Sequence, residues 1–226
     1  MAPDSKDNHK TYIIIPGPKM GVVSPELLKT IAGVVEKHDI PQLKLTVAQR
    51  LALIGYAPEK IDHIRQDLGN SGSPQKKAGV SYIKACPGKA WCNYGIQDAL
   101  VLGDKLEKTL LETALSFNAK VKVGISGCPM NCCESYVRDL GIFGRKNGWT
   151  LVFGGNGARK PRIGDVIDES MSDEQVLELA VKVLVYYNAN AVNRERTARF
   201  MERTGLEKLR NALGDSPSTL KEQHLP

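Results

Sequence analysis

The chain has 226 residues, 42% of them hydrophobic, which is enough to bury one large core or two small ones. Its five cysteines, an odd number without a secretory start, argue against a disulfide framework, and no apolar run approaches the length of a membrane span. The formal net charge is +6, but the sequence contains no long Lys/Arg block and no recognisable nucleic-acid module. We therefore expect a cytoplasmic protein that binds neither a membrane nor a nucleic acid.

The first part of the chain predicts a small unit over residues 11–69. Residues 1–10 are polar and are expected to be disordered rather than a signal peptide. A β-branched run at residues 12–15 predicts a strand. Ser24 and Pro25 then have the character of the N-cap and first residue of a helix that continues to about residue 38.

The first part of residues 43–54 has a second strand pattern. There Lys44, Thr46, Ala48 and Arg50 occupy alternate positions, so their side chains are expected on one face of a strand. A short helix over residues 57–68 completes a strand-helix-strand-helix order, which suits a ferredoxin-like α+β unit.

Residues 70–78 are rich in Gly, Ser and Pro and predict a linker to a second domain over residues 79–191. Strands predicted at residues 80–84 and 121–125 each end just before a pair of cysteines, and a helix is expected between them over residues 95–117. Each cysteine pair therefore lies on a loop that a strand anchors.

Downstream of these loops, residues 140–143 and 149–153 predict further strands. A capping box formed by Ser172 and Gln175 opens a helix with a periodic apolar face. Residues 192–226 are expected to form a helical extension, with a charged amphipathic helix or helix pair broken at Gly205.

The two cysteine pairs are the most informative feature of the sequence. Five residues separate Cys86 from Cys92, and three separate Cys128 from Cys132. Four thiolates from two loops suit a single iron–sulfur cluster. Structural zinc is the alternative, but zinc knuckles favour shorter spacings than the first of these. The ligand count by itself leaves the metal open.

The residues around these cysteines resemble the siroheme-containing sulfite and nitrite reductase family. The resemblance covers residues 12–190 or so, and its motifs follow the order of that family. They are Ala85-Cys-Pro-Gly with Cys92-Asn-Tyr-Gly95, Ser126-Gly-Cys-Pro with Cys132, Leu140-Gly-Ile-Phe-Gly144, Leu151-Val-Phe-Gly-Gly-Asn156 and Arg159-Lys-Pro-Arg162.

The resemblance implies a ferredoxin-like N-terminal unit followed by an α/β siroheme and iron–sulfur domain with a mixed sheet. It implies a [4Fe–4S] cluster held by Cys86, Cys92, Cys128 and Cys132, with Cys132 also serving as the axial thiolate of the siroheme iron. Cys133 would point away from the cluster if Cys132 began a helix, and we expect it to be a small buried residue.

A siroheme ring carries many carboxylates, and burying these without cations would be costly. The resemblance places Arg159, Lys160 and Arg162 beside the ring, after a turn in which Gly154, Gly155 and Asn156 allow close backbone approach. Lys84, next to the first cysteine loop, and Arg138, after the second, are further candidates.

The anionic substrate also needs cations. Where the cluster-bearing half of the larger enzymes has the pattern T-x-N-Q-N-L, this chain has Thr46-Val-Ala-Gln-Arg-Leu51, with Ala48 and Arg50 in place of the two asparagines. Arg50, Lys44 and Lys84 are therefore candidates for the substrate pocket. A second copy of the chain in a homo-oligomer is the other possible source of these charges.

The function that we expect is six-electron reduction of sulfite to sulfide by a minimal enzyme. The donor would be external, a small acidic ferredoxin-like protein, because the sequence has no recognisable nicotinamide or flavin motif. Reduction of nitrite to ammonia is the alternative reaction. A [4Fe–4S] electron-transfer subunit without siroheme and a zinc-stabilised binding protein are the alternatives from other classes.

Overall fold

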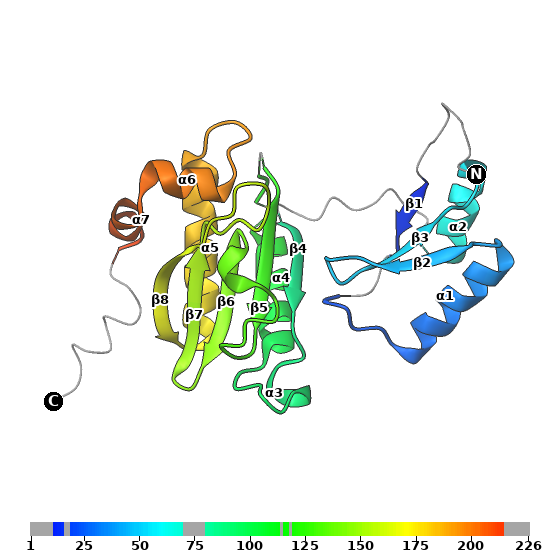
Figure 1. Ribbon diagram of the computed structural model, residues 1–226, viewed down its shortest axis with the longest axis horizontal. Helices are drawn as coiled ribbons and strands as arrows, with labels where there is room; N and C mark the ends of the chain where they lie inside the picture. Colours follow the sequence, from blue (N-terminus) through cyan, green and yellow to red (C-terminus); the bar gives the residue numbers. More distant parts are fainter. Residues whose placement is uncertain (1–10, 16–18, 70–79, 114, 118, 215–226) are drawn as a thin grey trace. The chain divides into compact units, whose positions relative to one another are not determined.

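The computed structural model describes residues 11–15, 19–69, 80–113, 115–117 and 119–214. The chain divides into two units, residues 1–76 and 77–226 (Figure 1). The predicted N-terminal tail and the predicted linker over residues 70–78 lie outside the described residues. No helix in the described ranges is long and apolar enough to cross a membrane.

The first unit is a three-stranded antiparallel sheet with helices. Its sheet order is β1-β3-β2. Its core contains Ile31 and Val34 of the first helix together with Leu53, Tyr56 and Ile64. The elements are β1 (Tyr12–Ile14), α1 (Pro25–Lys37), β2 (Gln42–Leu45), β3 (Leu51–Ile54), η1 (Pro58–Lys60) and α2 (Ile61–Asp67).

Helix α1 begins as predicted. Ser24 is its N-cap and accepts a hydrogen bond from the backbone N–H of Leu27, and Pro25 is its first residue. The side of α1 that carries Ile31 and Val34 is buried, so packing reinforces the start signal.

The prediction of one strand face carrying Lys44, Thr46, Ala48 and Arg50 was wrong. A tight turn separates β2 from β3, so the order is strand-helix-strand-strand-helix. The Thr46 backbone N–H donates to the Arg50 carbonyl over 2.8 Å, and the Thr46 hydroxyl accepts from the Arg50 N–H. Gln49 closes the turn with a φ of 56°. A hairpin can carry the same alternation of polar residues as a single strand, so this alternation did not distinguish one continuous strand from two strands joined by a turn.

The second unit is a five-stranded sheet of order β4-β5-β6-β7-β8. β4, β5 and β6 are parallel, whereas β7 is antiparallel to both of its neighbours, so the predicted mixed sheet is confirmed. Its elements are β4 (Val80–Ala85), α3 (Gly88–Trp91), α4 (Ala99–Glu112), β5 (Val121–Ser126), η2 (Ser135–Val137), β6 (Leu140–Arg145), β7 (Gly148–Phe153), β8 (Asp165–Met171), α5 (Asp173–Asn190), α6 (Thr197–Thr204) and α7 (Leu206–Leu213).

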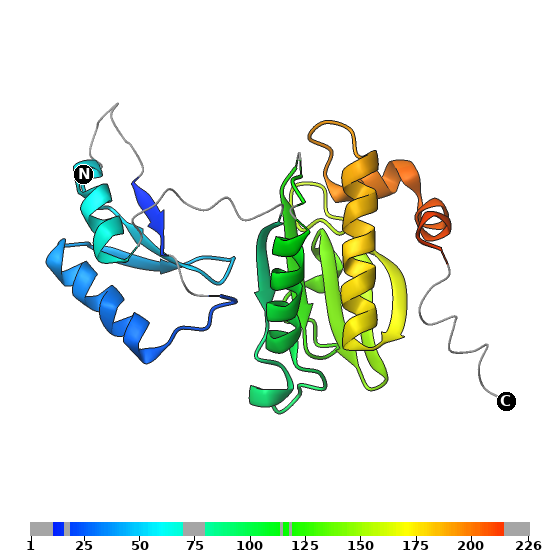
Figure 2. The same ribbon diagram turned by 180° about the vertical axis from the view of Figure 1, so that it is seen from behind.

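Helices α4 and α5 cover one face of this sheet (Figure 2), and the segment around η2 packs on the other. On β5, the alternate residues Val121, Val123 and Ile125 are fully buried. Gly124 and Ser126 lie under the η2 segment instead. Both faces of the central strands are therefore covered, although by different kinds of structure.

Two elements of the second unit differ from the sequence prediction. Helix α4 begins at Ala99 with Asp98 as its N-cap, because the backbone N–H groups of Ile96 and Gln97 both donate to the Gly127 carbonyl. Strand β8 was missed because its pattern of charged and apolar residues is irregular, and its pairing with β7 is interrupted by register shifts.

The C-terminal helices follow the sequence signals. The capping box of α5 is complete, since the Ser172 side chain accepts from the Gln175 N–H and the Gln175 side chain accepts from the Ser172 N–H. Gly205, with a φ of 80°, separates α6 from α7 as predicted.

The cap gives a direct test of what holds α5. Ser172→Ala removes the acceptor for the Gln175 N–H and should lower the free energy of unfolding by about 1 kcal/mol. Ser172→Asp retains an acceptor and should keep the thermal midpoint near that of the wild type. Equal midpoints for Ser172→Ala and Ser172→Asp in thermal unfolding would show that the cap adds nothing.

Candidate functional site

The first cysteine loop follows β4. Cys86 continues the pairing of β4 with β5 through its N–H, which donates to the Ile125 carbonyl over 3.1 Å. The Gly127 N–H donates to the Cys86 sulfur over 3.0 Å, a contact of the kind that stabilises a thiolate or a cluster ligand. The short helix α3 then leads to Cys92, whose N–H donates to the Gly88 carbonyl.

The second cysteine loop follows β5. Because β4 and β5 are parallel neighbours, their carboxyl ends lie at the same edge of the sheet, and the two cysteine pairs follow those ends. Cys128 is buried, whereas Cys132 is exposed. The hydrogen bonds from Ile96 and Gln97 to Gly127 tie the two loops to each other.

A turn, not a helix, carries Cys132 and Cys133. Asn131 and Glu134 flank the pair in left-handed conformations, with φ of 57° and 59°. The Cys133 N–H donates to the Ser126 hydroxyl over 3.0 Å, and the Asn131 side chain accepts from the Ser135 N–H over 2.7 Å. The helical rotation expected between the two cysteines is therefore wrong.

Cys133 is nonetheless buried, with 1% of its surface exposed, as predicted. Burial, followed by the nearby Cys86 sulfur, raises the pKa of the Cys133 thiol to about 12, so at neutral pH it remains a protonated side chain of the core. Of the two adjacent cysteines, Cys132 is the exposed one.

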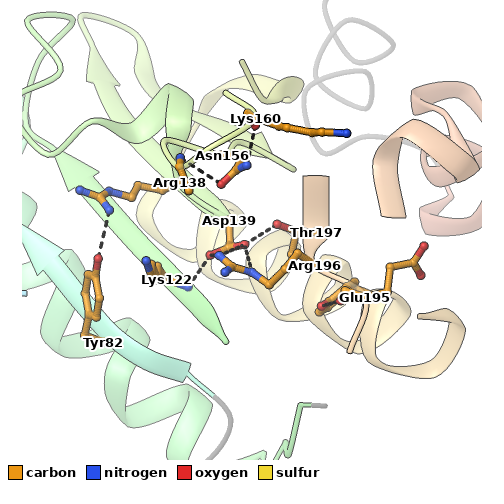
Figure 3. Close-up of polar contacts among 11 residues, drawn as sticks. Tyr82, Lys122, Arg138, Asp139, Asn156, Lys160, Glu195, Arg196 and Thr197 are labelled. Atoms are coloured by element: carbon orange, nitrogen blue, oxygen red, sulfur yellow. Dashed lines mark hydrogen bonds and ion pairs between the residues drawn. The ribbon is translucent and has the colours of Figure 1, made fainter. Parts of the chain in front are cut away.

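Two of the predicted cations meet next to this turn. Lys84 lies 3.5 Å from the Glu134 carboxylate, and Arg138 forms an ion pair with the same carboxylate. Arg138 also donates to the Tyr82 hydroxyl over 3.0 Å (Figure 3). Glu134 therefore links the strand that precedes Cys86 to the segment that follows Cys132.

The glycine-rich turn before β8 is organised mainly by the protein itself. A Cβ on Gly155 would lie 2.5 Å from the carbonyl oxygens of Tyr136 and Arg138, so glycine is required for packing against the segment after Cys132. Asn156 exchanges backbone hydrogen bonds with Arg162, and its side chain donates to the Lys160 carbonyl (Figure 3).

The predicted ring-binding cations of this turn differ in their surroundings. Arg162 donates to the Gly154 carbonyl and pairs with Asp165 over 2.6 Å, so its guanidinium has protein partners. Arg159 and Lys160 are exposed. Their role toward a siroheme stays a prediction.

The predicted substrate cations Lys44 and Arg50 belong to the first unit, whereas Lys84 and the cysteines belong to the second. Lys44 is exposed on β2, and Arg50 is half-buried at the end of the turn. Their role also stays a prediction.

A group that the sequence analysis missed surrounds Asp139, which is 2% exposed. Its carboxylate accepts from the Lys122 backbone N–H, from the Arg196 guanidinium and, over 2.6 Å, from the Thr197 hydroxyl (Figure 3). This network joins β5 to the start of α6, its N-cap Arg196 and its first residue Thr197. One available signal was Lys122 itself, a lysine within the apolar strand Val121–Ser126.

The donor set of the two loops fits an iron–sulfur cluster. Four thiols on loops at one sheet edge, one of them accepting a backbone N–H, match the ligands that such a cluster takes. Within the described ranges, no three Cys, His, Asp or Glu side chains converge as ligands of one metal ion. A cubane takes one thiolate per iron, so its ligands are more widely spaced than those of a single ion.

Comparison with known proteins identifies related chains. Residues 76–220 match the family described as the nitrite and sulphite reductase 4Fe-4S domain, and residues 4–71 match the nitrite/sulfite reductase ferredoxin-like half domain. The assimilatory-type sulfite reductase of Nitratidesulfovibrio vulgaris is 40% identical over 203 residues, which cover 90% of this chain and 92% of that protein.

A nitrite reductase [NAD(P)H] of Bacillus subtilis is 38% identical over 205 residues, but this chain spans 25% of its length. Among solved structures, the NirA protein of Mycobacterium tuberculosis has a TM-score of 0.74 at 20% identity, covering 90% of this chain and 40% of that one. Dissimilatory sulfite reductase I has a TM-score of 0.71 at 12% identity, covering 95% of this chain and 78% of that one. At these identities the structural likeness concerns the fold.

The packing of η2 on the sheet can be tested at Gly141 of β6. A Cβ there would lie 1.9 Å from the Ser135 carbonyl oxygen, so Gly141→Ala should displace the turn that carries Cys132. We expect a loss of about 1–3 kcal/mol in the free energy of unfolding and a lower content of iron and labile sulfide per chain.

Gly33→Ala is the matched control, because nothing lies within 4 Å of a Cβ at that position in α1. It should keep the cluster content and raise the stability by up to about 1 kcal/mol. Wild-type stability and cluster content in Gly141→Ala would contradict the close packing of η2.

Proposed function

The chain belongs to the nitrite and sulfite reductase family, and from this membership we propose that it reduces sulfite to sulfide at a siroheme coupled to a [4Fe–4S] cluster. The observation that carries the proposal is the match to the assimilatory-type sulfite reductase, which extends over nine-tenths of both chains. The substrates of the family are small anions, and both predicted cofactors agree with the matched domains.

Nitrite is the second candidate substrate. It is favoured by the 38% identity to the nitrite reductase of Bacillus subtilis. We rank it below sulfite because that relative is a much longer protein, of which this chain covers 25%.

The four cysteines would hold the cluster, with the exposed Cys132 as the thiolate shared with the siroheme iron. When bound, the two groups supply an iron that accepts the oxyanion and a store of single electrons beside it. Cys133, which is 1% exposed, is not proposed as a ligand.

Lys84 and Arg138 contribute positive charge close to the cysteine loops. Their side chains are 13% and 10% exposed, so little water screens them, and Glu134 holds both in position. A protonated lysine in such a place can orient an anion and donate a proton at Nζ. Arg50 and Lys44 remain proposed substrate cations. Arg50 stands where the family pattern has its second asparagine, and Lys44 lies two residues before the pattern begins, so the proposal rests on their charge and on their place in the sequence rather than on a shared strand face.

The electron donor is proposed to be a small acidic ferredoxin-like protein, since the chain carries a net charge of +6. A homo-oligomer is the alternative source of additional cations.

The ligand assignment predicts a sharp difference between neighbouring cysteines. Cys132→Ser should lose at least about a hundredfold in sulfite turnover with reduced viologen, because it removes the thiolate that would hold both the cluster and the siroheme iron. Cys133→Ala should stay within about threefold of the wild type, since it removes a buried sulfur that makes no proposed ligand bond.

The same preparations carry the test of function. The absorption spectrum should contain a Soret band with a chlorin-like red band, and turnover of sulfite should exceed that of nitrite. A siroheme-free protein from a siroheme-competent host would overturn the proposed function. Equal losses of turnover in the two cysteine variants would overturn the assignment of Cys132 as the ligand.

Charge steering predicts the behaviour of the donor. With an acidic [2Fe–2S] ferredoxin as donor, kcat/KM should fall severalfold as salt rises from about 0.05 to 0.5 M, because charges are screened beyond about 10 Å at 0.1 M. Reduced methyl viologen, a small cation, should show no such decline. A salt-independent rate with the ferredoxin would argue against docking on a basic surface.

A further inference from the structure

A small pocket lies beside η2 in the second unit. Residues from β5, from the segment after η2, from the Asn156 turn and from the segment before α6 line it, among them Lys122, Arg138 and Arg196. Its volume is about 50 Å³. Because a water molecule needs roughly 10–15 Å³ on this measure, the pocket has room for a few waters or for one carboxylate-sized anion, but not for a macrocycle.

Asp139, the acidic residue that lines the pocket, is already fully hydrogen-bonded within the protein. Asp139 accepts hydrogen bonds from Arg196, from the Thr197 hydroxyl and from the backbone of Lys122 (Figure 3). Its two oxygens are therefore committed to groups around the pocket, and Arg196 is neutralised by it.

Two donors of the lining residues are not matched in this way. Within the described residues no hydrogen bond or ion pair holds the Lys122 ammonium group, and the buried Nε of Arg138 has no hydrogen-bond partner. Arg138 is 9% exposed, so water reaches it poorly. Buried polar groups are normally hydrogen-bonded, and an exception calls for a ligand or water.

The charges around the pocket favour an anion. Three cations line it, Lys122, Arg138 and Arg196, against one acidic lining residue, Asp139. Arg196 pairs with Asp139, and Arg138 pairs with Glu134, which does not line the pocket. Lys122 therefore adds a positive charge that no ion pair within the described residues neutralises. Burial lowers the pKa of Lys122, and the charges of Arg196, Arg138 and Lys120 lower it further against the opposing effect of Asp139. A bound anion would relieve this repulsion.

We propose that this pocket is a binding site for one small oxyanion group of the carboxylate class, held by Lys122 and Arg138. Two sources have this chemistry. One is a peripheral carboxylate of the siroheme, and this possibility rests on the proposed function. The other is a free oxyanion in solution, and this possibility does not depend on siroheme.

Lys122→Met tests the pocket in the full-length protein purified from a siroheme-competent host. Lys120→Met is the matched control, because Lys120 is exposed, lies two residues away and does not line the pocket. If the ligand is a siroheme carboxylate, the half-life of siroheme on the protein during dialysis should shorten about tenfold in Lys122→Met, as expected for the loss of one charge-assisted hydrogen bond. The cluster content should not change.

If the ligand is a free oxyanion, siroheme retention should be unaffected. Acetate or sulfate, added at constant ionic strength, should then raise the thermal midpoint of the wild type and of Lys120→Met but not that of Lys122→Met. Lys122→Arg should restore whichever property is lost, which separates charge loss from misfolding.

The proposal would be overturned if Lys122→Met and Lys120→Met had the same siroheme half-life and the same rise in thermal midpoint with acetate or sulfate. The pocket would then hold only water. Wild-type protein without siroheme would refute the proposed function instead. The anion titration would still decide the pocket in that case.

Discussion

Parallel pairing of β4 with β5 is the constraint on which the site depends. It brings the ends of both strands to one edge of the sheet, and the two cysteine loops follow those ends. The anchor beneath them is strong, because Val121, Val123 and Ile125 are fully buried and each such side chain is worth about 1.5–3 kcal/mol. By comparison, a left-handed non-glycine residue costs about 1–2 kcal/mol. The sheet can therefore support the strained Asn131 and Glu134.

Buried polar contacts, rather than a helix, decide which of two adjacent cysteines faces outward. The Ser126 hydroxyl accepts from the Cys133 N–H and lies 3.1 Å from the Ser135 hydroxyl. The Ser135 hydroxyl lies 3.1 Å from the Gly124 carbonyl oxygen of β5 and 2.9 Å from the Ile142 carbonyl oxygen of β6, so its single proton is donated to one of them or shared between the two. Leaving one of these groups unsatisfied would cost about 1–3 kcal/mol, so the network favours one orientation of the turn.

The sequence predicted the features that local signals determine. The caps of α1 and α5, the strands before the cysteines and the break at Gly205 all have such signals. The hairpin between β2 and β3 escaped because alternating residues are shared by a single strand and a turn between strands. Strand β8 and the Asp139 network depend on contacts with residues far along the chain. Asp139 and Arg196 are 57 positions apart, and no periodicity relates them.

We expect substrate choice to reside outside the framework that this chain shares with relatives named for sulfite and for nitrite. Relatives named for sulfite and for nitrite match this chain at 40% and 38% identity, so a framework common to both does not distinguish the anions. Sulfite is a pyramidal dianion and nitrite a planar monoanion, and a site that separates them has to differ in the number and direction of its cations.

Lys84 and Arg138 share one carboxylate, which lowers the charge available to an anion and makes their exact pairing with Glu134 important. A change of one such pair alters charge without altering the fold, because the buried rows of β5 and the parallel sheet edge stay in place. Specificity in this family of folds is therefore expected to depend on a few long, charged side chains near the cysteine loops, which composition and motif spacing constrain least.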